Sequence, residues 1–463
     1  MRRYGLSKSR IIIGLQCVKR LWLAVHRPEL AEVSAQTERL WAGGHRVGEV
    51  ARSLHPGGVL IEAFSDLRHA KAETRTALAQ PGDKVLFEPA FDYGGVVVRA
   101  DLLFAGPGGN RLVEVKASTA VKDYHLNDAA VQAWVITRSG LDLDAVAVAH
   151  IDSQFVYQGD GDYCGLFREV DVGGRIQPVM KQIPVWITDF RQALAGPLPA
   201  IEVGPQCHSP FDCPFLGHCA PHTESASCAE LPRLDSAAHE MALSLGYPRA
   251  YLDFEAIAFG VPIWAGTRPY EQLPFQWSLH VERADGALDH GEFLDTTGEP
   301  PMRAVAESLV AALADAGAAG PQAPVLTYGT YERSILQGLA QRFPDLGPAL
   351  LSIADRLVDL LACTRRWYSH PAMHGSWSLK AVLPTVAPDL DYASLADVRD
   401  GGAAQDAYLQ LIDGDVQDEQ SAAAQAPELT EARRAALRTA LLAYCAQDTL
   451  ALVRLVHFFA ESG

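Results

Sequence analysis

Residues 96–116 of the 463-residue chain read VVVRADLLFAGPGGNRLVEVK, and this stretch decides the fold of the first half. β-Branched residues lead up to Asp101, a Gly-Pro-Gly-Gly-Asn turn follows, and a second apolar run alternates with Glu114 and Lys116. Successive side chains of a strand point to opposite faces, so Glu114 and Lys116 share one face. The stretch predicts two neighbouring strands on which two carboxylates and a lysine converge.

That combination of side chains favours a particular chemistry. Carboxylate oxygens suit a hard divalent cation, and a nearby ammonium suits the attacking water and a scissile phosphate. The pattern therefore indicates phosphodiester hydrolysis with Mg²⁺ or Mn²⁺, between which oxygen ligands do not distinguish. A surface salt bridge between neighbouring strands is the alternative that Glu-x-Lys alone leaves open.

Outside this stretch, both halves of the chain show mixed α and β patterns. The first half predicts helices at 35–53 and 125–138 and strands at 84–91, 95–104, 111–117 and 145–151. The second half predicts strands at 249–255, 274–282, 291–295 and 324–328 and helices at 302–316 and 429–461. A polar seam at 220–248 separates them, which predicts two α/β domains, 1–235 and 236–463.

Composition and charge narrow the class of protein. With 48% hydrophobic and 21% charged residues the chain is expected to be globular, and its lack of an 18-residue uncharged apolar run predicts no membrane span and a cytoplasmic protein. The net charge of −17 argues against a nucleic-acid partner, yet residues 1–230 hold 23 Lys and Arg against 26 Asp and Glu. A basic strip that could face phosphates comprises Arg2, Arg3, Lys8, Arg10, Lys19 and Arg20.

Three cysteines are regularly spaced. Cys207, Cys213 and Cys219 form C-x5-C-x5-C in a loop-like stretch, and Cys17 is the best fourth ligand. Four thiolates suit a [4Fe–4S] cluster that ties together the two ends of the first domain. A zinc site and unrelated thiols are the alternatives, with His208, His218 or Cys228 as substitute ligands.

A second acidic set lies in the other half. Asp253 and Glu255 are two residues apart on a predicted strand, so they share a face. Tyr444 and Asp448 are four residues apart on the predicted terminal helix and also share a face. Acids directed toward one another need a cation, so these residues predict a second metal site.

The segments VVVRADLLF and RLVEVKAS resemble the core of PD-(D/E)xK nucleases, in particular their RecB-like branch. The resemblance implies that His45, in WAGGHRVGEVA, is a further metal ligand beside Asp101 and Glu114. It also implies that Gln132, in NDAAVQAW, orients the substrate, and Glu49 is a further residue on the His45 face. The four cysteines resemble those of the iron–sulfur members of this branch, which include CRISPR-associated nucleases.

The strand-borne Asp253 and Glu255 with the helix-borne Tyr444 and Asp448 resemble DEDD exonucleases of the ribonuclease-H-like fold. The resemblance implies that the three acids hold metal ions and that Tyr444 orients the nucleophilic water. The fourth acid departs from the pattern, because VLTYGTYERSIL offers Glu332 in its place. Asp359 is a further acidic residue at a strand end.

As a whole, the chain resembles an uncharacterised bacterial family that joins these two domains. The resemblance implies a metal-dependent nuclease that cleaves DNA, single-stranded or at ends, in repair, recombination or defence. No Gly-x-x-x-x-Gly-Lys-Ser/Thr motif is present, so any unwinding would come from a helicase or repair partner. A nucleic-acid-binding module with degenerate metal sites and a ribonuclease are the alternatives, and the oligomeric state is not predicted.

Overall fold

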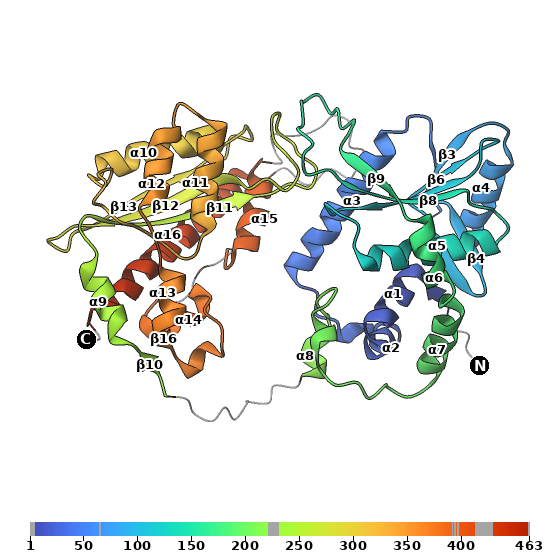
Figure 1. The fold of residues 1–463 in the computed structure, drawn as a ribbon, viewed down its shortest axis with the longest axis horizontal. Coiled ribbons are helices and arrows are strands. Elements are labelled where there is room, and N and C mark those ends of the chain that lie inside the picture. The colour runs from blue at the N-terminus through green and yellow to red at the C-terminus, as the bar shows by residue number, and fades with distance from the viewer. Residues whose placement is uncertain are drawn as a thin grey trace. The chain divides into compact units, whose positions relative to one another are not determined.

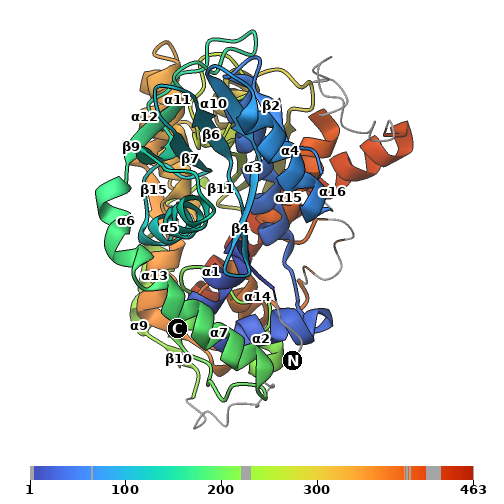
Figure 2. The ribbon, with the colours of Figure 1, turned by 90° about the vertical axis from the view of Figure 1, so that its right-hand side faces the viewer.

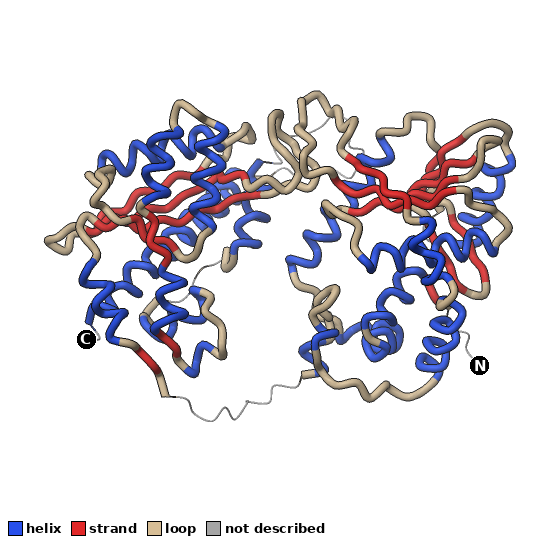
Figure 3. Tube along the Cα trace, viewed as in Figure 1, coloured by secondary structure: helices blue, strands red, loops and turns tan. Residues whose placement is uncertain are grey.

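The structure is a computed structural model that describes residues 5–63, 66–220, 231–390, 392, 395, 398–412 and 429–461. The chain forms two compact units of mixed α/β structure (Figures 1 and 3). Unit 1 comprises Met1–Ser225 and Phe259–Tyr270, and unit 2 comprises Ala226–Ala258 and Glu271–Gly463. Each unit has its own sheets and its own candidate site.

Unit 1 is built on a six-stranded mixed sheet. Its order is β2-β3-β6-β7-β8-β9, in which β2 and β3 are parallel, β7 and β8 are parallel, and the other neighbours are antiparallel. The strands are β2 (Val59–Leu60), β3 (Lys84–Phe87), β6 (Leu102–Ala105), β7 (Arg111–Lys116), β8 (Ala145–Ile151) and β9 (Phe167–Asp171).

A smaller sheet and the helices complete this unit. Its order is β1 (Leu6–Ser7), β5 (Val96–Arg99) and β4 (Ala90–Tyr93). Helix α5 lies between the large sheet and the N-terminal helices, and buries Val131, Val135 and Ile136 in the core (Figures 1 and 2). The helices of the unit are α1 (Lys8–Gln16), α2 (Val18–His26), α3 (Ala35–Ser53), α4 (Leu67–Ala79), α5 (Asp123–Arg138), α6 (Gly173–Met180), α7 (Ile183–Ala195) and α8 (Leu216–Cys219).

Two predicted strands, 84–91 and 95–104, are each divided between the two sheets. The first breaks at Glu88 and Pro89, where Glu88 has a positive φ of 55° and Pro89 has no N–H to donate. The second breaks at Ala100 and Asp101. The breaks lie side by side, since Glu88 N donates to Asp101 O at 3.3 Å and Ala100 N donates to Pro89 O at 3.2 Å. Asp101 is thus at a crossing between sheets rather than inside a strand.

The segment 259–270 belongs to unit 1 although it directly follows β11 (Arg249–Ile257), a strand of unit 2. Tyr163 Oη donates to Pro262 O and Tyr157 N donates to Thr267 O, both at 3.0 Å. Val261 is buried in a cluster with Val47 of α3. The predicted division at residue 235 places this segment in the second domain, whereas in the structure it belongs to unit 1.

Unit 2 is built on a five-stranded sheet of order β13-β12-β11-β14-β15. The first three strands are antiparallel neighbours, whereas β14 is parallel to both β11 and β15. β11 is buried on both faces because helices cover both sides of the sheet (Figure 1). The strands are β11 (Arg249–Ile257), β12 (Leu273–Glu282), β13 (Leu288–Leu294), β14 (Val325–Thr327) and β15 (Leu357–Asp359).

The helices of unit 2 lie on either side of this sheet. α10, α11 and α12 cover one face and α16 covers the other (Figure 1). A short antiparallel pair, β10 (Arg233–Leu234) and β16 (Tyr368–Ser369), lies outside the sheet. The helices are α9 (Ser236–Ser244), α10 (Met302–Asp315), α11 (Tyr331–Arg342), α12 (Gly347–Asp355), α13 (Leu360–Trp367), α14 (Leu379–Val386), α15 (Gly401–Ile412) and α16 (Glu431–Glu461).

Among the described residues, α16 is the one helix long and apolar enough to cross a membrane by length and composition. Half of its most apolar window is buried inside the protein. Leu441, Leu452 and Val456 are fully or almost fully buried, and the helix packs on β11 and β12. Packing against the sheet of unit 2 therefore accounts for its apolar character.

Candidate functional site

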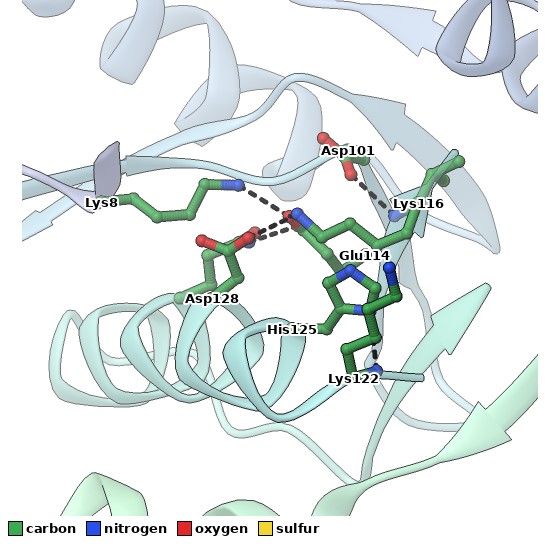
Figure 4. Close-up of polar contacts among 9 residues, drawn as sticks. Lys8, Asp101, Glu114, Lys116, Lys122, His125 and Asp128 are labelled. Carbon is green, nitrogen blue, oxygen red and sulfur yellow. Dashed lines mark hydrogen bonds and ion pairs between the residues drawn. The ribbon is translucent and has the colours of Figure 1, made fainter. Parts of the chain in front are cut away.

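The predicted carboxylate–lysine set of unit 1 comes together in the structure. Glu114 and Lys116 lie on the same face of β7, and Lys116 Nζ is 2.8 Å from Glu114 Oε1 (Figure 4). The Asp101 carboxylate accepts a hydrogen bond from Val115 N at 2.7 Å. The backbone of β7 thus holds Asp101 beside the strand that carries Glu114 and Lys116.

Helix α5 supplies the other side of this cluster. Gln132 Nε2 donates to Glu114 Oε2, and Lys116 Nζ donates to Asp128 Oδ2 at 2.5 Å. Asp128 and Gln132 are one turn apart on α5 and so face β7 together. Sequence reasoning found Gln132 but missed Asp128, which the same four-residue spacing could have revealed.

The charges of the cluster shift one another's pKa values. Burial and the neighbouring Glu114 raise the pKa of Asp101 to about 7. Burial alone would raise the pKa of Glu114, but Lys116 and Lys8 outweigh it and hold that pKa below its usual value. Burial opposes the charge of Lys116, yet Glu114 and Asp128 raise its pKa. The two lysines thus favour the ionised form of Glu114, whereas burial and Glu114 disfavour that of Asp101.

His45 and Asp101 line one pocket of about 230 Å³. Glu88 and Arg52 line it as well, and burial raises the pKa of Glu88. Sequence reasoning missed Glu88, although an acidic residue before a proline in the apolar run VLFEPAF was a signal. Glu49, which was expected on the face of His45, is half exposed and lies 3.5 Å from Arg46 instead.

The four described residues of the predicted basic strip each make a contact within the protein. Lys8 points inward, with Nζ 2.8 Å from Glu114 Oε1 (Figure 4). Arg10 donates to Gly5 O at 2.7 Å and Lys19 donates to Ile201 O at 3.1 Å. Arg20 donates to Gln16 Oε1, and Arg2 and Arg3 lie outside the described residues. These contacts help to position the N-terminal helices.

The four predicted cysteine ligands line a single pocket. Cys17 lies between α1 and α2, and Cys207, Cys213 and Cys219 come from the loop and short helix after α7. All four cysteines that the structure describes here have free thiols, and they line this pocket together with Arg20 and Phe215. Of the alternative ligands, His208 faces Asp212 at 3.1 Å and Cys228 lies outside the described residues.

The predicted acids of unit 2 also converge. Carboxylate oxygens of Asp253, Glu255 and Asp448 all lie within 4.8 Å of one another. Asp253 and Glu255 project from one face of β11, and Asp448 projects from α16, which packs on that strand. Three acids at this separation form an arrangement that can bind a divalent cation.

Two tyrosines and a cysteine surround Asp448 and Asp253. Tyr392 Oη donates to Asp448 Oδ1, and hydrogen bonds from Tyr392 and Tyr444 act to lower the pKa of Asp448. The buried Cys445 thiol donates to Asp253 Oδ2 at 3.4 Å. Tyr444 was predicted, whereas Tyr392 carries no sequence signal because it comes from a loop 56 residues away.

Glu332, the predicted fourth acid, lies at the start of α11 outside this group of three. The residue is 3% exposed, and its Oε2 atom has no hydrogen-bond partner among the residues that the structure describes. Its charge nevertheless raises the pKa of Asp253, so the two carboxylates are close enough to repel each other. Asp359 is used differently, since its carboxylate accepts from Ala362 N and caps α13.

Burial and mutual repulsion disfavour the ionised form of this acidic set. Burial is the largest cause at each position, and Asp448 further raises the pKa of Glu255, to about 8. The pKa of Glu332 is raised to about 7 and that of Asp448 to about 6. Lys380 of α14 partly offsets the repulsion at Glu255 and Asp448, and its Nζ lies 5.3 Å from the centre of the Tyr444 ring. A bound cation would relieve the remaining repulsion.

The comparisons with known proteins reach only one part of the chain. Residues 250–378 match the family described as Domain of unknown function (DUF2779). No curated protein matches the chain. The matched segment contains Asp253, Glu255 and Glu332 and ends before Lys380 and Asp448, so it is similar to this family over one side of the acidic site of unit 2.

Proposed function

We propose that this chain is a metal-dependent nuclease with two sites, a RecB-like PD-(D/E)xK site in unit 1 and a DEDD-type exonuclease site in unit 2. The observation that carries the proposal is the buried cluster in which Glu114 contacts both Lys116 and Gln132 beside Asp101. These residue types come from a strand, a helix and a crossing between sheets. A structural ion pair on one strand would not require that convergence.

The topology of unit 1 supports this assignment. Four strands, β3, β6, β7 and β8, form a mixed core sheet, with α3 before them and α5 between the last two. The acid precedes β6, Glu-x-Lys lies on β7, and Gln132 lies on the helix that follows. This is the order expected from the PD-(D/E)xK resemblance.

The topology of unit 2 supports the second assignment. Its strands in chain order occupy positions 3-2-1-4-5 of the sheet, the first three antiparallel and the last two parallel to the first. This arrangement supports the proposal of a ribonuclease-H-like domain. The acids lie on the central strand and on the helix that crosses it, as a DEDD-type site requires.

Four cysteines that line one pocket support the proposal of a [4Fe–4S] cluster held by Cys17, Cys207, Cys213 and Cys219. Tetrahedral zinc held by the same four thiolates is the alternative, and the iron content of the purified protein distinguishes the two. The cluster would join the N-terminal helices to the loop after α7 and contribute mainly to stability.

The chemistry proposed for unit 1 is hydrolysis of a phosphodiester. A divalent cation at Asp101, Glu114 and His45 would stabilise the charge that develops on the phosphate. Lys116 would neutralise further negative charge and lie near the attacking water, while Gln132 would hold Glu114 in orientation. Water adds to phosphorus, the P–O bond to the leaving nucleotide breaks, and the leaving oxygen takes up a proton.

The test is cleavage by anaerobically purified protein. Labelled single- and double-stranded DNA and RNA would be incubated with Mn²⁺ and the wild type, Lys116→Ala, Asp253→Ala or the double variant, after the iron content is measured. We expect iron-containing protein that cleaves DNA through Lys116, with end trimming through Asp253. Cleavage of RNA alone would make it a ribonuclease. DNA binding without cleavage by the wild type would refute the nuclease and support a binding module.

A further inference from the structure

Helix α1 connects the two candidate centres of unit 1. Its first residue, Lys8, has Nζ 2.8 Å from Glu114 Oε1, the same oxygen that Lys116 contacts. The residue that ends it, Cys17, lines the cysteine pocket. Nine helical residues span about 14 Å, so one rigid element reaches both places.

The N-terminal end of α1 is fixed to the strand that leads to Asp101. Ser7 caps the helix by accepting from Arg10 N at 3.2 Å. Leu6 and Ser7 pair in parallel with β5, and Leu6 is buried. Because Asp101 follows β5 by two residues, the backbone that places Lys8 is paired with the backbone that places Asp101.

The other end of α1 is fixed to the loop that carries the cysteines. Gln16 Nε2 donates to Gln206 O at 2.8 Å and to Phe211 O at 2.6 Å. Gln206 directly precedes Cys207, and Phe211 lies two residues before Cys213. Between the two ends, a Cβ atom at Gly14 would come within 2.8 Å of the Phe190 ring, so α1 packs closely on α7.

We propose that Lys8 is a positioning residue of the unit 1 site and that α1 makes its placement depend on the cysteine pocket. The inference rests on the proposed function, because Glu114 is taken as a cation ligand. Lys8 and Lys116 hold one Glu114 oxygen while Gln132 holds the other, which fixes the orientation of the carboxylate. The positive charge of Lys8 also repels an incoming cation. Lys8 therefore fixes the orientation of the Glu114 carboxylate but weakens cation binding.

The test compares Lys8→Met and Lys8→Arg in a full-length chain that carries Asp253→Asn, so that the unit 2 site contributes little to Mn²⁺ binding. Loss of the charge is expected to tighten Mn²⁺ binding about tenfold while the cleavage rate falls. Lys8→Arg keeps the positive charge, so its Mn²⁺ affinity and cleavage rate should stay near those of the chain with Lys8. Lys71→Met is the matched control, because Lys71 also pairs with a carboxylate, Asp92 at 2.7 Å, on another part of the unit.

If Lys8 were needed only for folding, Lys8→Met would weaken Mn²⁺ binding and slow cleavage together. Folded Lys8→Met protein with unchanged or weaker Mn²⁺ binding therefore overturns the proposal. If the unsubstituted chain cleaves no nucleic acid, the proposed function fails, yet calorimetric Mn²⁺ affinities still decide whether Lys8 belongs to the site.

The link through α1 is tested by Gly14→Ala, which removes no cysteine and changes neither site directly. The added methyl group must displace α1 from Phe190. We expect tighter Mn²⁺ binding, as in Lys8→Met, and no further tightening when the two substitutions are combined. Independent, additive effects, or no effect of Gly14→Ala on Mn²⁺ binding, would show that α1 does not transmit the link.

Discussion

Lys116 Nζ lies 2.8 Å from Glu114 Oε1, two residues back on the same strand. Glu114 is almost fully buried, so its charge depends on cationic partners. We predict that Lys116→Ala lowers the free energy of unfolding by about 3 kcal/mol. This is the lower end of the usual cost of breaking a buried ion pair, because Lys8 still contacts Glu114. Urea unfolding measures the loss. Lys116→Ala with Glu114→Gln should cost less than the sum of the single changes, and full additivity would show that the pair is not coupled.

The acids of unit 2 make stability depend on pH in a defined direction. Folding raises the pKa of Glu255 from 4.5 to about 8 and that of Asp448 from 3.8 to about 6, so the protonated forms are favoured in the folded state. Their stabilising contribution is complete below about pH 4 and is lost as pH rises through 6 to 8. We therefore predict that metal-free protein loses thermal stability over this range.

Added Mn²⁺ should have the opposite pH dependence, because it binds the deprotonated acids and displaces protons. The increase in melting temperature caused by Mn²⁺ should grow from pH 5.5 to about pH 8. Scanning fluorimetry measures this increase in Asp101→Asn protein, which lacks one proposed ligand of the unit 1 site, with and without Asp253→Asn/Glu255→Gln. A Mn²⁺ shift that is the same at every pH, or equal in the two proteins, would contradict a cation site on these acids.

Local periodicity predicted the parts of each site that lie on one element. Glu114 with Lys116 and Asp253 with Glu255 follow from the two-residue repeat of a strand, and Tyr444 with Asp448 follows from a helical turn. Lys8 lies 106 residues from Glu114, and no local pattern could reveal that contact. The crossing between sheets at Asp101 could not be predicted from hydrophobicity, because the apolar run continues through it. Only the strands with which the backbone forms hydrogen bonds change there.

The return segment 259–270 should stabilise unit 1 rather than unit 2. Its Pro262 and Thr267 carbonyls accept from Tyr163 and Tyr157, which stack on each other, and Val261 packs beside α3. We predict that a Gly-Ser replacement of equal length lowers the stability of unit 1 by about 2–4 kcal/mol, because it removes the buried Val261 side chain and disturbs the hydrogen bonds to Tyr157 and Tyr163. Hydrogen exchange should show faster exchange in α3 with the β11–β12 pair unchanged. The reverse distribution would assign the segment to unit 2.

Tyr392 and Tyr444 both approach Asp448 and allow a matched comparison. Tyr392→Phe removes a donor to a mostly buried carboxylate and should cost about 2 kcal/mol of stability. Tyr444→Phe should change stability less and slow the trimming of labelled DNA ends by about a hundredfold, since Tyr444 is expected to orient the water. Trimming is measured in Lys116→Ala protein so that unit 1 does not contribute. Equal rates for the two tyrosine variants would remove Tyr444 from the reaction and leave it a structural partner of Asp448.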